Sequence, residues 1–174
     1  MDIGVLILRI LLAGVLFIHG TQKAMGWFSG PGLDAAETTF DKFGQRPART
    51  MVKVAVTCEL FAATSLLFGL ANSLGTAVAT GTMLVASVSM NRLSNAFWNT
   101  AGGGEYPLVL AVLAAAVGFT GPGRFSVDNA IAASWHEVST DSQAWLGGLA
   151  LVLALLAAAP ILIRSSRARR HGVT

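Results

Sequence analysis

The chain has 174 residues, of which 53% are hydrophobic and only 12% are charged. A soluble domain is usually about a quarter charged. The apolar residues here also fall in long blocks, which excludes a disordered chain, a fibrous protein and an ordinary soluble enzyme, and indicates a polytopic membrane protein. The net charge of +3 does not indicate a nucleic-acid partner, because the basic residues lie between and after the apolar blocks. The single cysteine, Cys58, excludes an internal disulfide and a thiolate metal cluster.

Five apolar segments predict five membrane-spanning helices. In chain order they cover residues 3–20, 52–71, 74–90, 106–119 and 145–163. The first has no basic start and no small-residue cleavage site, so we expect a retained helix rather than a signal peptide. The fourth is short for a span of about 20 residues, and we expect its ends in the headgroup region. The sequence therefore predicts an all-α, polytopic transmembrane helical bundle.

Two connecting loops are expected to carry short helices at the membrane interface. In the loop after the first segment, Asp34 is a candidate cap for a helix with Phe40 and Phe43 on one face. In the last loop, Ser126 is the candidate cap. That second helix would carry three residues on one face, namely Val127, Ile131 and Trp135.

The distribution of lysine and arginine predicts the orientation. Basic residues cluster after the first, third and fifth segments. With five spans, these three clusters fall on one side of the membrane, whereas four spans would separate the first loop from the tail. By the positive-inside rule, the N-terminus then lies outside and the C-terminus in the cytoplasm.

Ionisable residues within the spans are the first candidates for a functional site. Arg9 either reaches the outer surface or turns inward to a partner. His19 and Lys23 are four residues apart and share a helix face, where they either anchor the helix at the interface or donate to an anionic or carbonyl oxygen. Glu59 must be paired or protonated, and its expected partner is His19 or Arg9.

Further polar residues follow in the third and fourth segments. A narrow stripe on the third helix either bonds to a neighbouring helix or forms a polar wall facing Glu59 and His19, and it consists of Thr76, Thr80, Ser87 and Asn91. Glu105, just before Tyr106 and Pro107, suits the start of a helix on the same side as His19. The sequence contains no phosphate-binding loop, serine hydrolase or zinc protease motif. We expect no metal site, because the three histidines should lie in different layers.

These residues also carry a family resemblance. The sequence reads Leu-Arg-Ile at 8–10, His-Gly-Thr-Gln-Lys at 19–23, Glu-Tyr-Pro-Leu at 105–108 and Gly-Pro-Gly-Arg-Phe-Ser-Val-Asp at 121–128. Over about residues 5–130 it resembles the DoxX family of bacterial membrane proteins. The resemblance implies a four-helix membrane core, a redox-linked role and a quinone as the small-molecule partner. The residues that it marks are His19, Lys23, Glu59, Glu105 and Arg124, and we add Arg9 and Asn91 as candidate ligand-binding residues.

Taken together, these observations predict a DoxX-like core over residues 1–130, an extracytoplasmic loop over 131–144, a fifth helix over 145–163 and a basic cytoplasmic tail over 164–174. The fifth helix departs from the family core and is expected to be a lipid anchor or a docking surface for another membrane subunit. The expected function is that of a plasma-membrane subunit that binds a quinone or lipid near the cytoplasmic interface. A partner complex would hold the electron carrier. A structural or assembly subunit of a larger complex and a small-solute transporter stay open as alternative functions. The expected partners are other membrane subunits or further copies of this chain.

Overall fold

The computed structural model describes residues 2–133 and 140–171, and within these ranges the chain is helical without a strand. The elements in chain order are α1 (Asp2–Met25), α2 (Gly32–Lys42), α3 (Ala48–Phe68), α4 (Asn72–Ser94), the short η1 (Asn99–Ala101), α5 (Glu105–Thr120), α6 (Val127–Ala133) and α7 (Thr140–His171). The all-helical prediction is confirmed.

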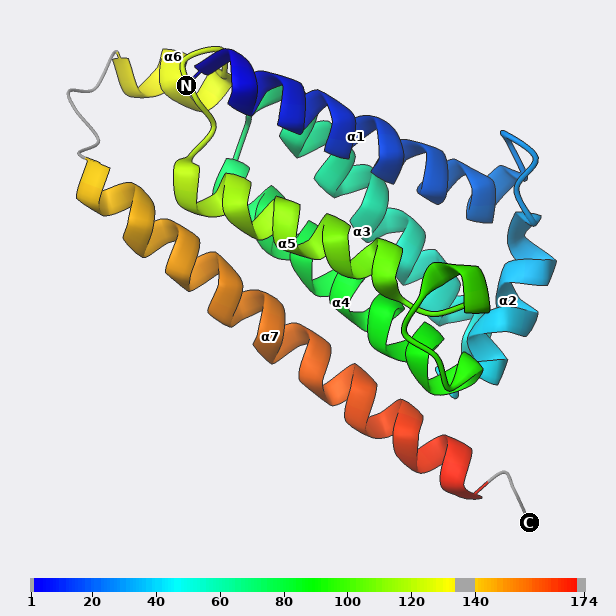
Figure 1. Cartoon of the computed structure of the whole chain (residues 1–174). Helices are drawn as coiled ribbons and strands as arrows, with labels where there is room; N and C mark the ends of the chain where they lie inside the picture. The colour runs from blue at the N-terminus through cyan, green and yellow to red at the C-terminus, as the bar shows by residue number, and fades with distance from the viewer. Residues whose placement is uncertain (1, 134–139, 172–174) are drawn as a thin grey trace.

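Five of these helices run side by side between two ends of the molecule, namely α1, α3, α4, α5 and α7 (Figure 1). Four are long and apolar enough to cross a membrane, and α5, with 16 residues, is the shorter one. The chain is therefore a multi-pass membrane protein, and the fourth predicted span is short as expected. The start of α1 and α6 lie at one end, here called the α6 end, and α2 and the C-terminal end of α7 lie at the other, the α2 end (Figure 1).

The apolar core lies between α1, α3, α4 and α5. It is built around Leu12, Leu16, Leu66, Met83 and Val117, which are all almost completely buried. Between these large side chains, buried alanines allow the helix backbones to approach closely, and they include Ala62, Ala79, Ala111 and Ala114. The core thus fixes α1 against α3, and α4 against α5, which is the framework that positions the site.

The first predicted interfacial helix is present as α2. Phe40 is buried against Val52, with Phe43 packed beside them, so the predicted apolar face is confirmed. Asp34 does not cap the helix, because α2 begins two residues earlier and has no side-chain cap. Asp34 instead lies in the first turn, where it forms an exposed ion pair with Arg49 at 3.0 Å.

The second predicted interfacial helix is α6. Ser126 Oγ accepts the backbone N–H of Asn129 at 3.1 Å, which confirms Ser126 as its cap. Trp135, the last residue of the predicted apolar face, lies outside the described residues.

The C-terminal helix is longer than its apolar segment. α7 starts at Thr140 rather than at residue 145, and it continues to His171. Most of the predicted basic tail is therefore helix, because the arginines, serines and alanine that follow the apolar segment also tolerate helical geometry. The predicted loop over 131–144 likewise contains the end of α6 and the start of α7.

The packing of α7 also differs from that of a peripheral anchor. It lies against both α4 and α5 through small residues, since Ala150, Ala154 and Ala158 are all buried. Near its C-terminal end, Leu162 O accepts a hydrogen bond from Arg92 Nη1 at 2.9 Å. At Gly44, which has φ +75°, a Cβ atom would lie 2.5 Å from the backbone oxygen of Ser165. The helix is therefore packed into the bundle from about Ala150 to Ser165.

Candidate functional site

A cavity of about 680 Å³ lies between α3, α4 and α7 and extends to α1, α2 and α5. Small and apolar side chains form most of its wall, including Ala55, Ala77, Gly81, Ala86 and Ala157. The polar groups on the wall include His19, Lys23, Glu59, Gln45 and Asn99. Its volume lies within the range of about 300–1,000 Å³ that is typical of small-molecule sites, and its mixture of apolar walls and few polar groups is typical too.

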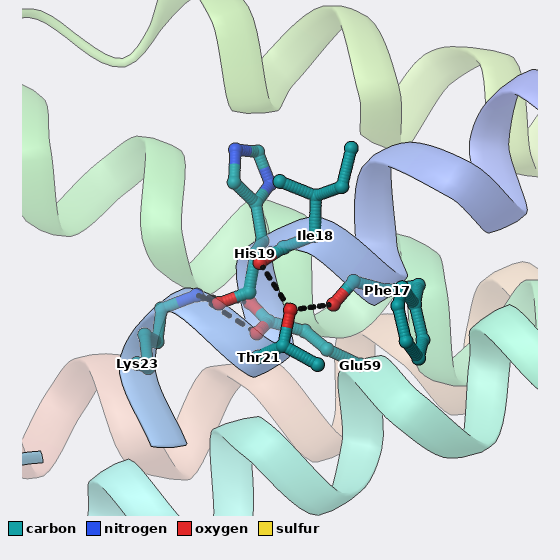
Figure 2. A network of polar contacts seen from close by, with 6 residues as sticks. All are labelled: Phe17, Ile18, His19, Thr21, Lys23 and Glu59. Carbon is teal, nitrogen blue, oxygen red and sulfur yellow. Dashed lines mark hydrogen bonds and ion pairs between the residues drawn. The ribbon is translucent and has the colours of Figure 1, made fainter. Parts of the chain in front are cut away.

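A buried ion pair marks the polar part of this cavity. Lys23 Nζ lies 2.6 Å from Oε1 and 2.8 Å from Oε2 of Glu59, so both carboxylate oxygens are engaged (Figure 2). The side chain of Glu59 is 2% exposed and that of Lys23 is 23% exposed. The prediction that Glu59 pairs with Arg9 or His19 is wrong. Its partner is Lys23, which reaches it because α1 continues as a helix to Met25 and packs along α3.

His19 lies beside this pair but turns its ring elsewhere. Figure 2 shows the imidazole pointing away from the facing side chains of Lys23 and Glu59. The ring packs edge-on against Tyr106 of α5, with ring centres 5.8 Å apart and planes at 87°. Since His19, Lys23, Glu59 and Tyr106 all line the cavity, the predicted His19–Lys23 pair does face one space, although each residue has its own partner.

Glu105 and Asn91 order the loop between α4 and α5. Glu105 Oε2 accepts the backbone N–H of Asn99 at 3.1 Å, and Asn91 Oδ1 accepts the backbone N–H of Gly104 at 2.6 Å. Neither residue lines the cavity, but Asn99 does. The structure thus places both predicted residues next to the site, at the same end as His19. Their side chains accept backbone N–H groups of the loop and do not face the cavity.

The polar stripe of α4 faces α5. Thr80 Oγ1 donates to Ala111 O at 3.5 Å, and a Cβ atom at Gly118 would lie 3.0 Å from Thr76 Oγ1. Of the two alternatives open for this stripe, helix–helix contact is therefore the one that the geometry supports. The adjacent face of α4, which carries Gly81 and Thr82, lines the cavity instead.

Arg9 lies at the α6 end, far from the ion pair. Its side chain is buried, with 1% exposure for the residue, so it does not reach the outer surface. The guanidinium donates to four backbone carbonyls, at distances of 2.6–3.1 Å. These belong to Leu66 and Leu67 at the end of α3 and to Pro122 and Phe125 in the loop after α5. Arg9 and Glu59 do not pair, and Arg9 joins three segments instead of binding at the cavity.

The remaining predicted residue, Arg124, is also at the α6 end. Its side chain is exposed, and its backbone N–H donates to Asp2 Oδ1 at 3.0 Å. Nearby, the two carboxylate oxygens of Asp128 accept the N–H groups of Ala71 and Asn72 at 2.8 Å each. Arg9, Arg124 and Asp128 therefore form a separate structural junction, and the seven predicted residues do not converge on one site.

Sequence reasoning missed several residues of the cavity. Gln45 is 4% exposed and its Nε2 donates to Ser89 Oγ at 3.0 Å, although nothing in the loop sequence marks it. Tyr106 has a signal, since it follows Glu105 within the family-like stretch, but the pattern there predicts only the start of a helix. Within residues 2–133 and 140–171, no group of three or more His, Cys, Asp or Glu residues is arranged to hold a metal ion.

Comparison with known proteins connects this site to a family. The DoxX family model matches residues 4–92, about half of the chain. This stretch includes α2 and α3 and nearly all of α1 and α4, and so contains Arg9, His19, Lys23 and Glu59. It ends before Glu105 and the 121–128 loop, so it is shorter than the resemblance over residues 5–130. No curated protein and no solved structure matches the chain. By its first 92 residues, which contain the buried ion pair, the chain belongs to the DoxX family.

Proposed function

We propose that this protein binds a quinone-type lipid in the cavity, with the polar ring against His19 and the Lys23–Glu59 pair. The observation that carries the proposal is the arrangement of the cavity wall, which is mostly apolar with a few polar groups, among them His19 and Lys23 of α1 and Glu59 of α3. A quinone needs an apolar slot for its tail and one or two hydrogen-bond donors at its carbonyl oxygens. The His19 ring and the Lys23 ammonium are two of the hydrogen-bond donors that line this cavity.

The ion pair gives the proposed site its chemistry. Glu59 holds the Lys23 ammonium in place through both carboxylate oxygens. Lys23 has three N–H donors, and the one that does not bond Glu59 makes a long hydrogen bond of 3.5 Å to His19 O, which a quinone carbonyl oxygen would replace. On this proposal, quinone reduction would take two electrons from a partner protein with a flavin, haem or iron–sulfur centre, and His19 would relay protons.

The same proposal assigns the α2 end to the cytoplasmic side of a bacterial plasma membrane. The C-terminal ends of α2, α4 and α7 lie at this end (Figure 1). Basic residues in or beside these helix ends include Lys42, Arg46, Arg92, Arg164 and Arg167. The positive-inside rule then supports an N-terminus outside and a C-terminus in the cytoplasm. The ring-binding part of the cavity would lie near the cytoplasmic interface.

Native mass spectrometry of the protein extracted gently from its own membrane tests the proposal. We expect a quinone-sized adduct on the wild-type protein, and its loss from the His19→Ala and Glu59→Gln variants. Arg124→Ala is the matched control, because this exposed side chain lies at the opposite end, and its adduct should persist. An adduct that persists in all three variants would contradict the proposed site.

A structural or assembly subunit is the second candidate function. It is favoured by the outer face of α7, where Leu149, Val152 and Leu156 are exposed and apolar. A complex that keeps full turnover after loss of this chain would support that role over quinone binding. Small-solute transport is a third alternative, and a liposome flux assay with no uptake would exclude it.

A further inference from the structure

We infer that α7 forms one wall of a groove for a long hydrocarbon tail, so that this helix, which lies outside the family-matched residues, selects long-chain ligands. The inference rests on the proposed function and extends it from the ring to the tail. It assigns α7 a role in ligand binding, in place of the anchoring role expected for it.

The first observation is the length of the cavity. Residues of α4 line it from Leu74 to Met90, and at 1.5 Å per residue this stretch is about 24 Å long. The hydrocarbon core of a bilayer is about 30 Å thick. A quinone ring alone would occupy only a small part of this length, and the rest is suited to an extended chain.

The second observation is the way α7 faces the cavity. Leu153, Ala157 and Ile161 line it at four-residue spacing, so they form one stripe along the helix. Ala154 and Ala158 also border it and are buried, and a Cβ atom at Gly81 would lie 3.2 Å from Ala154 O. The small residues thus seat α7 closely on α4, and the neighbouring stripe closes the side of the groove.

The third observation is the opposite wall, which is formed by α3. Val54, Ala55 and Cys58 line the cavity there. The side chains at Ala55, Cys58 and Ala157 are small and leave space between the two walls, and a leucine at Ala157 would narrow the groove at that point. Ala157 is exposed rather than packed in the core, so enlarging it would not disturb the contacts that hold α7 on α4.

Charge decides which class of lipid fits. The positive charge of Lys23 is balanced by Glu59 at 2.6 Å, so the polar part of the groove carries no free cation from this pair for a phosphate group. A neutral head group, such as a quinone ring, therefore suits the site better than an anionic phospholipid. The occupant that we assign is a neutral ring with a long isoprenoid or alkyl chain.

The test compares two quinones, one with a long isoprenoid chain and one with a single isoprene unit, on the full-length protein in nanodiscs. Ala157→Leu should weaken long-chain binding at least tenfold and change short-chain binding less than threefold. Ala159→Leu is the matched control, since Ala159 is exposed on α7 and does not line the cavity, and it should change neither. Leu153→Ala should cause a smaller loss, also confined to the long-chain quinone.

The outcomes separate this inference from the proposed function. If wild-type protein binds neither quinone, both fail. If both quinones bind but Ala157→Leu and Leu153→Ala leave the long-chain affinity unchanged, the role of α7 is refuted while the ring site stands. If phosphatidylglycerol displaces the long-chain quinone at equal concentration, the groove holds a phospholipid and the inference is overturned.

Discussion

Replacing Arg9 should destabilise the protein strongly without touching the cavity. Its guanidinium donates hydrogen bonds both to the end of α3 and to the loop after α5. Among the described side chains of α1, no other makes hydrogen bonds to both segments. Arg9→Met would keep the length and apolar stem of the side chain while removing all four hydrogen bonds. The carbonyls of Leu66, Leu67, Pro122 and Phe125 would then lose a charged donor.

The size of the effect follows from these four bonds. A hydrogen bond to a charged group contributes about 1.5–3 kcal/mol. Only the bond to Leu66 O is fully buried, and the other three are partly buried, so water would replace part of the loss. Arg9→Met also removes the free-energy cost of burying the guanidinium charge, which offsets a further part of the lost stability. We therefore expect the free energy of unfolding to fall by about 3–6 kcal/mol.

Arg9→Lys distinguishes geometry from charge. Lysine keeps the positive charge, but its single ammonium cannot match the planar fork that spans α3 and the 121–126 loop. We expect Arg9→Lys to lose at least half as much stability as Arg9→Met. Arg124→Ala, an exposed residue of the same loop, should change the free energy of unfolding by less than about 0.5 kcal/mol.

Unfolding in mixed detergent micelles, followed by tryptophan fluorescence, measures all three variants. A loss below about 1 kcal/mol for Arg9→Met would refute the reasoning, since one ordinary hydrogen bond contributes that much. An Arg9→Lys variant as stable as the wild type would show that charge alone suffices and that the four-carbonyl geometry is not what stabilises this end.

Two further predictions concern stability at the two ends of the bundle. Lys23→Met leaves the Glu59 carboxylate buried without its partner and should cost about 3–5 kcal/mol, whereas Lys23→Met combined with Glu59→Gln should recover most of that loss in the same unfolding assay. Equal stability of the single and double variants would contradict a coupled pair. Asp128→Ala removes the side chain that accepts the N–H groups of Ala71 and Asn72 at the start of α4 and should cost about 0.5–2 kcal/mol. Asp128→Asn, which keeps an acceptor oxygen, should cost less, and a loss equal to that of Asp128→Ala would argue against a capping role.

The fold was predictable from sequence because a membrane imposes strong and simple constraints. Apolar blocks predicted the four long helices and the shorter α5, and an apolar face predicted α2. Helix ends were less predictable. Hydropathy marks where apolar residues stop, but α1 and α7 continue as helices through polar residues to Met25 and His171. That difference matters, because the added turn of α1 is what carries Lys23 to Glu59.

The candidate site was predictable only in part. Depth along a helix suggested that Glu59 pairs with His19 or Arg9, but depth alone does not specify which way each side chain turns. Arg9 donates to backbone carbonyls at the end of α3. Every helix end has such unpaired carbonyls whatever its residues, so a sequence pattern does not identify them as partners. The cavity itself depends on how α7 sits against α4, which small residues permit but do not specify.

The central claim is that a quinone ring binds beside His19 and the Lys23–Glu59 pair, and its most direct test is photo-crosslinking with an azido-quinone, mapped by peptide mass spectrometry. We predict labels on cavity-lining stretches at the α2 end, namely residues 19–23 of α1, 51–59 of α3 and 99–107 around the start of α5. An excess of a non-photoreactive long-chain quinone should suppress these labels. Labels confined to the outer face of α7 or to the α6 end, or labels that the competitor does not suppress, would contradict the claim.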